Sequence, residues 1–195
     1  MRATTQLPAG YREIYAVDLQ KDKKTALWVN LISLAVMAVM IALANHFLSI
    51  STLFDFSDGA GVYFLRMGIV LMGMVVYVIL HELTHGAVMK HYGAKKLRFG
   101  FTGLYAYCGS EEDFFSKKAY IQVALAPLVV WGVILTILCA LVPKSWFWVL
   151  YLIQIANVSG AAGDVFVTLK FAKMPSDILV KDTGVSMTVY SGAER

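Results

Sequence analysis

Residues 62–89 read VYFLRMGIVLMGMVVYVILHELTHGAVM, and this stretch decides the fold. It is apolar and, at about 1.5 Å of rise per residue, long enough to cross the hydrocarbon core of a bilayer as one α-helix. Its last third nevertheless carries His81, Glu82 and His85. Ionisable side chains are costly inside an apolar span and usually serve a function there. The stretch therefore predicts a transmembrane helix that carries a functional site.

The motif HELTHG at residues 81–86 has the spacing of a zinc site. On a helix, His81 and His85 lie one turn apart on the same face, where their nitrogens can bind one Zn2+ at about 2.0–2.1 Å each. Glu82 can accept a proton from a water molecule that the metal activates. Gly86 is expected to leave the helix surface open beside the metal. The competing interpretation, two surface histidines and a solvated glutamate at a helix end, is disfavoured by the apolar span.

The composition indicates a membrane protein. Hydrophobic residues make up 58% of the chain and charged residues only 15%, and a soluble domain carries a much larger charged fraction. The net charge of +4 does not indicate a nucleic-acid partner, because Lys and Arg gather at the ends of the apolar runs, as membrane topology requires. Two cysteines are too few for a disulfide framework. We therefore expect one integral membrane domain.

Three more apolar runs are long enough to span a bilayer, at about residues 26–48, 119–141 and 146–169. The expected fold class is thus all-α integral membrane, with about four transmembrane helices. Basic residues precede the first run, lie between the second and third, and follow the fourth. Because cytoplasmic loops carry the excess of Lys and Arg, both termini and residues 90–118 are expected in the cytoplasm, and residues 49–61 and 143–144 outside.

Two cytoplasmic segments alternate apolar and polar residues as β-hairpins do. The first pairs residues 97–101 with 104–108, and the second pairs 178–181 with 185–190. They are either plain surface hairpins or a small cap over the motif that offers an edge strand to an extended substrate. The acidic stretch Ser110–Asp113 predicts an N-cap and first turn for the third span rather than metal ligands.

A catalytic zinc site normally takes three protein ligands and a water molecule, so a third ligand is expected. Asp164 is the strongest candidate, because the second and fourth spans run in the same direction. It lies at a depth similar to that of His81 and His85, about 8–14 Å inside the basic boundary. The small residues before it would let the two spans approach closely.

Alternatives to this third ligand remain open. Cys108 is the main rival, since a thiolate also suits zinc. His46 lies at the outer end of the first span, and His91 points away from the motif. The competing interpretation of Asp164 is a carboxylate that reaches water at the cytoplasmic edge. Asn157, on nearly the same helix face as Asp164, can hydrogen-bond a ligand or a substrate backbone.

Several stretches together resemble the bacterial zincin membrane peptidase family. They are the span that ends in HELTHG, the basic β-like segment, and the stretches SGAAGD (159–164), MPSD (174–177) and LPAGY (7–11). The layout is also similar to that of site-2-type intramembrane metalloproteases, with HExxH on one span and an aspartate ligand on a later one. The later span of this chain lacks the Asn-x-x-Pro and Leu-Asp-Gly sequences of the site-2 group.

This resemblance implies His81, His85 and Asp164 as zinc ligands and Glu82 as the catalytic carboxylate. The expected domains are a cytoplasmic N-terminal segment (1–25), a four-span metallopeptidase-like domain (26–170) and a cytoplasmic tail with a hairpin (171–195). The expected reaction is zinc-dependent hydrolysis of peptide bonds near the cytoplasmic face of the bacterial cytoplasmic membrane. Its partners would be the lipid bilayer and a peptide or transmembrane protein substrate.

Two other classes of function remain. A metal-binding membrane protein that holds clients without cutting them has no need of Glu82. A small transporter would use the buried histidines and aspartate as an ion path. Zinc stoichiometry separates the transporter from the two zinc proteins, and cleavage separates the protease from the client-binding protein.

Overall fold

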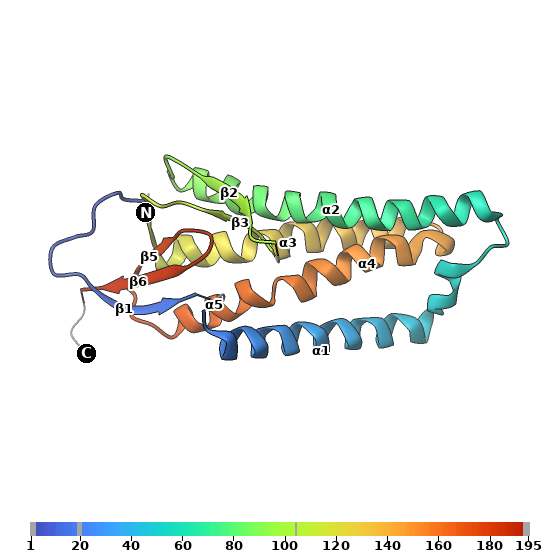
Figure 1. The fold of residues 1–195 in the computed structure, drawn as a ribbon, viewed down its shortest axis with the longest axis horizontal. Helices are drawn as coiled ribbons and strands as arrows, with labels where there is room; N and C mark the ends of the chain where they lie inside the picture. The colour runs from blue at the N-terminus through green and yellow to red at the C-terminus, as the bar shows by residue number, and fades with distance from the viewer. Residues whose placement is uncertain (1–2, 19–20, 104, 193–195) are drawn as a thin grey trace. The chain divides into compact units, whose positions relative to one another are not determined.

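The computed structural model of the chain describes residues 3–18, 21–103 and 105–192. Four helices of this part are long and apolar enough to cross a membrane (Figure 1). They are α1 (Lys23–Phe47), α2 (Ala60–His91), α3 (Lys117–Leu141) and the span Lys144–Ala172, which comprises α4 (Lys144–Gly160) and α5 (Ala162–Ala172). A short 3-10 helix (Ile50–Phe54) follows α1. The prediction of four long apolar helices is confirmed.

The chain divides into two compact units. The first, here the sheet unit, comprises Met1–Val29, His81–Ala126 and Gly163–Arg195. The second, here the helical unit, comprises Asn30–Leu80 and Pro127–Ala162. The HELTHG motif and Asp164 both belong to the sheet unit.

The sheet unit contains two antiparallel sheets. In the larger sheet, β1 (Arg12–Val17) pairs with β6 (Met187–Ser191), β6 with β5 (Leu179–Asp182), and β5 with β4 (Phe114–Ser116). The first strand of the chain thus lies beside the last (Figure 1). The smaller sheet pairs β2 (Arg98–Phe101) with β3 (Ala106–Gly109).

Both predicted hairpins are present, as β2–β3 and β5–β6; Leu104, the expected first residue of one strand, lies outside the described residues. The sequence pattern predicted neither β1 nor β4. These two strands extend the second hairpin into a four-stranded sheet. Both pair with segments far away along the chain, and β4 has only three residues, so the local pattern carried little signal. The fold is therefore mostly helical with small sheets rather than all-α with two isolated hairpins.

The prediction that Ser110–Asp113 caps the third span is wrong. Helix α3 begins at Lys117, directly after β4, and its first turn holds no acidic residue. The Asp113 side chain is buried and accepts hydrogen bonds from the Lys95 backbone N–H (3.0 Å) and the Ser110 hydroxyl (2.6 Å). Asp113 therefore ties the turn after α2 to the segment between β3 and β4, a role that depends on residues far away in the sequence.

Helix α2 stops sharply just after the motif. Gly93 has a φ of +97°, which a residue without a Cβ adopts readily. The Ala94 N–H donates to the Met89 carbonyl (3.0 Å) and the Gly93 N–H to the Lys90 carbonyl (2.9 Å). This is the Schellman arrangement, which satisfies the last carbonyls of a helix. The chain can therefore turn from α2 toward β2 within a few residues.

A hydrophobic core joins the strands of the larger sheet to the helix segments of the sheet unit. Its buried members are Val17, Met89, Ala94, Cys108, Phe115, Ala119, Tyr120, Val123, Ala124, Val167, Phe171, Ile178, Val180 and Val189. Complete burial of a side chain such as that of Phe115 or Phe171 contributes about 1.5–3 kcal/mol. The core therefore holds the helix segments that carry the motif and Asp164 against one rigid sheet.

The helical unit has a buried polar network around Asn157. The Tyr77 hydroxyl donates to the Asn157 side-chain oxygen (2.9 Å), and the Asn157 amide donates to the Leu128 carbonyl (3.3 Å). Gln154 donates in turn to the Thr136 hydroxyl (3.1 Å). Polar groups inside an apolar bundle must pair with one another. The side-chain oxygen and nitrogen of Asn157 therefore both have hydrogen-bond partners within the protein, and neither needs a ligand or a substrate.

Candidate metal centre

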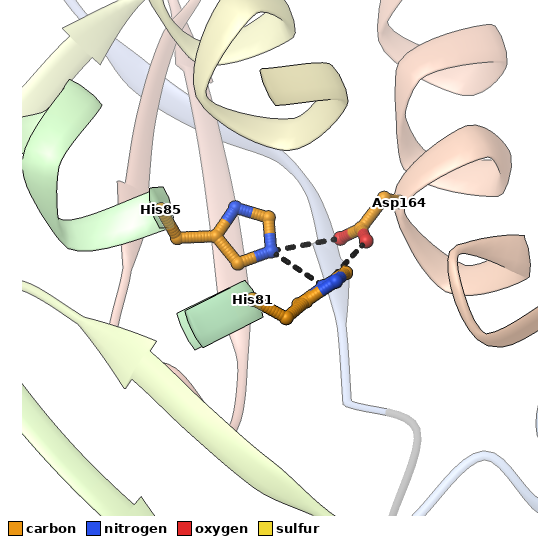
Figure 2. A group of neighbouring side chains, drawn as sticks. All are labelled: His81, His85 and Asp164. Carbon is orange, nitrogen blue, oxygen red and sulfur yellow. Dashed lines mark hydrogen bonds and ion pairs between the residues drawn. The ribbon is translucent and has the colours of Figure 1, made fainter. Parts of the chain in front are cut away.

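Three side chains predicted as metal ligands converge in the sheet unit. His81 and His85 come from α2 and Asp164 from α5, and all three point toward one another (Figure 2). The Nε2 atoms of the two histidines are 3.1 Å apart. His81 Nε2 is 3.4 Å from Asp164 Oδ2, and His85 Nε2 is 3.6 Å from Asp164 Oδ1. The carboxylate of Asp164 thus lies beside both imidazole rings.

The donor set and its spacing fit zinc. Imidazole nitrogen and carboxylate oxygen are both common zinc ligands, and two donors of a tetrahedral site with bonds of about 2.0–2.1 Å lie about 3.3 Å apart. The three distances of the cluster are close to that value. Within the described part of the chain, these residues form the one cluster of three His, Cys, Asp or Glu side chains whose donor atoms all lie within 4.8 Å.

The orientation of His85 depends on a backbone carbonyl of α3. Its Nδ1 lies 2.9 Å from the Val123 carbonyl oxygen. Because a carbonyl only accepts hydrogen bonds, His85 donates through Nδ1–H, and the neutral ring then carries its lone pair on Nε2. That lone pair faces the cluster. Histidine ligands are commonly held this way by a second hydrogen bond.

One non-helical residue, Ala161, precedes Asp164 within the fourth span. The sequence predicted one continuous helix over 146–169, but α4 ends at Gly160 and α5 begins at Ala162, with Ala161 at ψ 8°. Asp164 therefore lies in the first turn of α5, where the helix dipole favours a carboxylate. Lys117 Nζ donates to the Ala172 and Met174 carbonyls at the other end of α5 (2.8 and 2.7 Å).

Glu82 and Gly86 both contact the β2–β3 hairpin. The Cys108 backbone N–H lies near the Glu82 carboxylate and interacts favourably with its charged form. A Cβ on Gly86 would lie 2.8 Å from the Phe99 ring and 3.1 Å from the Leu97 side chain. The open surface expected at Gly86 is therefore filled by the hairpin. A side chain at position 86 would require the end of the Phe99 ring to shift away from the motif.

The other sequence candidates lie outside the cluster. Cys108 is buried, and its burial, followed by the charges of Glu82 and Asp182, raises the pKa of its thiol to about 12. It is thus a thiol near neutral pH in the metal-free protein. Among the described residues, neither Cys108 nor His46 nor His91 belongs to the donor cluster.

The sheet unit has a second buried polar contact that the sequence did not predict. Asp182, in β5, accepts hydrogen bonds from the Tyr120 hydroxyl (2.6 Å) and the Gly184 backbone N–H (2.7 Å). Burial raises the pKa of the Asp182 carboxyl to about 6. The Asp-Thr-Gly turn was visible in the sequence, but the burial of its carboxylate against α3 requires the tertiary structure.

Comparisons with known proteins agree with the motif. The chain is 32% identical over 122 residues to a Pyrococcus woesei protein named "Uncharacterized 24.7 kDa protein in gap 5'region". The alignment covers 60% of this chain and 52% of that protein, so the chain spans about half the length of this relative. No solved structure matches the chain.

A family model described as "Putative zincin peptidase" matches residues 74–179, more than half of the chain, and this match includes the motif and Asp164. The chain therefore belongs to this zincin peptidase family.

Proposed function

We propose that this protein is a zinc-dependent membrane peptidase that cleaves membrane-associated polypeptides near the cytoplasmic face. His81, His85 and Asp164 are the proposed zinc ligands, and Glu82 is the proposed catalytic carboxylate. The observation that carries this proposal is the convergence of three suitable donor atoms, 3.1 to 3.6 Å apart, from two helices. The membership of a zincin peptidase family supports the same reaction class.

The chemistry follows from the chain's own groups. Zinc bound by the three ligands would supply a Lewis acid for a water molecule and a peptide carbonyl. Glu82, next to His81 in the chain, would take a proton from the attacking water. The water oxygen then bonds to the carbonyl carbon, the C–N bond breaks, and Glu82 returns the proton to the leaving nitrogen. The Cys108 N–H would hold the carboxylate in place during both transfers.

The β2 strand is a suitable place for an extended substrate. Among the described residues, β2 pairs only with β3, so its other edge offers free backbone groups. Phe99 and Leu97 hold this hairpin close to Gly86 of the motif. An extended peptide can add to such an edge by main-chain hydrogen bonds. A transmembrane substrate would first have to unwind locally, because a helix uses its carbonyls in its own hydrogen bonds.

The exposed surface of the long helices supports a location of this protein in the lipid bilayer. Large apolar side chains are exposed along them, for example Leu71 (70% exposed) and Leu138 (39%). Such a surface is unfavourable in water and suits hydrocarbon. The segments with the basic residues fall in the sheet unit, and the two connections expected outside fall in the helical unit. This division fits a cytoplasmic sheet unit that carries both termini, in the cytoplasmic membrane of a bacterial cell.

Cysteine labelling tests this topology. In a Cys108→Ser, Cys139→Ser background, Asp55→Cys should react with a membrane-impermeant maleimide added to intact cells. Lys96→Cys should react only after the membrane is permeabilised. Both positions are exposed, so the membrane alone would decide the difference. Labelling of position 55 only after permeabilisation would overturn the topology.

Metal analysis of the purified full chain tests the proposed function itself. We expect about one zinc per wild-type chain and a loss of most of it in His81→Ala, because two remaining ligands bind zinc poorly. His91→Ala is the matched control, since His91 lies on the same helix at its exposed end. If His81→Ala contains as much zinc as the wild type, the proposed metal site is wrong.

A further inference from the structure

Helix α3 contains a proline at a position that matters for the metal centre. Pro127 lies inside the helix, four residues after Val123. Proline has no backbone N–H, so the Val123 carbonyl lacks its usual partner within the helix. Val123 is only 1% exposed. A buried carbonyl of this kind needs a hydrogen-bond donor from elsewhere in the protein.

The donor that reaches this carbonyl is a proposed zinc ligand. His85 Nδ1 lies 2.9 Å from the Val123 oxygen, and His85 is itself only 8% exposed. The hydrogen bond holds the proton on Nδ1 and leaves Nε2 free to face Asp164 Oδ1, 3.6 Å away. The Val123 carbonyl and the His85 ring thus satisfy each other. The carbonyl lacks its usual donor within the helix, and the Nδ1–H group of His85 requires an acceptor.

We infer that Pro127 is a positioning residue of the metal centre: it keeps the Val123 carbonyl available to orient His85. The inference rests on the proposed zinc site for the function of Pro127, and on the observed contact between His85 and Val123 for the orientation of the ring. With an ordinary residue at 127, a new N–H would donate to Val123 from within the helix. His85 would then share its acceptor, and its ring would be held less firmly in the tautomer that zinc requires.

The decisive comparison separates the missing N–H from the shape of proline. Pro127→Ala restores the N–H. The ester analogue of that variant, made with lactic acid at position 127, has the same side chain but an oxygen in place of the N–H. Pro143→Ala, at the N-cap of α4, controls for the loss of a proline elsewhere. All variants are made in the full chain and purified in detergent.

Zinc affinity is the first measurement, by competition with a chelator. Pro127→Ala should bind zinc at least about tenfold more weakly than the wild type, the usual effect of losing a hydrogen bond to a metal ligand. The ester analogue and Pro143→Ala should stay within about threefold of the wild type. Equal affinity of Pro127→Ala and the wild type would overturn the inference. So would an ester analogue as weak as the alanine variant, since shape would then be the cause.

The tautomer of His85 is the second measurement, by 15N NMR of the metal-free protein with labelled histidine. The wild type and the ester analogue should show the Nδ1–H form of His85, and Pro127→Ala should show a mixture of forms. This result does not require zinc. A wild type that binds no zinc would refute the proposed function, and the tautomer comparison would still decide the role of Pro127. An unchanged tautomer in Pro127→Ala would refute that role.

A third variant covers the case in which Pro127→Ala does not fold. Lactic acid at position 124 converts the bond after Val123 into an ester, which makes the Val123 carbonyl a weaker acceptor and leaves Pro127 in place. We expect a shift of the His85 tautomer in the same direction as in Pro127→Ala. A His85 tautomer identical to that of the wild type would contradict the inference.

Discussion

Glu82→Gln is expected to keep its zinc and to lose hydrolysis by about 10²–10⁴-fold, the usual contribution of a general base. The glutamine amide has nearly the same shape as the carboxylate, and its oxygen can still interact with the Cys108 N–H. It cannot accept the proton of the attacking water. Because Glu82 is not a proposed ligand, the zinc content should not change.

The measurement is the cleavage of fluorescein-labelled β-casein, an unfolded chain that offers extended segments, with zinc determined on the same samples. Glu112→Gln is the matched control. Glu112 is exposed and pairs with Lys96 (3.0 Å) at the surface, so that variant should cleave as the wild type does. Undiminished cleavage by Glu82→Gln would remove the proposed mechanism. A loss of zinc from Glu82→Gln would instead assign Glu82 a role in metal binding.

Asp164→Ala is expected to weaken zinc binding by more than about 100-fold, because even the partners behind a ligand contribute 10–100-fold. The carboxylate offers one oxygen to each histidine, at 3.4 and 3.6 Å. Its removal would leave only two protein ligands for the metal. Zinc content after dialysis and chelator competition both report this change.

Cys108→Ser is the variant that tests the rival ligand. It should keep its zinc, because Cys108 lies outside the donor cluster and its backbone N–H, not its thiol, is the group that favours the Glu82 carboxylate. The substitution retains that N–H. If Cys108→Ser loses zinc and Asp164→Ala keeps it, the thiol is the third ligand and the assignment of Asp164 is wrong.

Local patterns in the sequence were sufficient for the helices and for part of the site. Apolar runs of bilayer length predicted all four long helices, because burial in hydrocarbon depends on composition over a window rather than on particular partners. The spacing of His81 and His85 predicted their shared face, because the geometry of one helical turn is independent of the rest of the fold. The two hairpins followed from alternation of apolar and polar residues on either side of a turn.

Strands and polar contacts that depend on distant partners were not predictable. β1 finds its place beside β6, at the other end of the chain. The sequence placed Asp113 in the first turn of the third span and Asp182 in a hairpin turn, yet both are buried and hydrogen-bonded within the sheet unit. A short polar or half-apolar segment can adopt many local conformations and hydrogen-bonding patterns. The packing of the whole sheet unit selects one of these conformations.

The sequence by itself determined that this protein has four bilayer-length helices and a zinc-type motif near the end of one of them. The tertiary structure alone decided which side chains meet. Depth along a span follows from residue counting at a constant rise, so Asp164 was placed near the level of the histidines. Which way a helix is rotated, and where it breaks, follow from packing: the break at Ala161 and the reach of His85 to the Val123 carbonyl exist only once the helices are packed together.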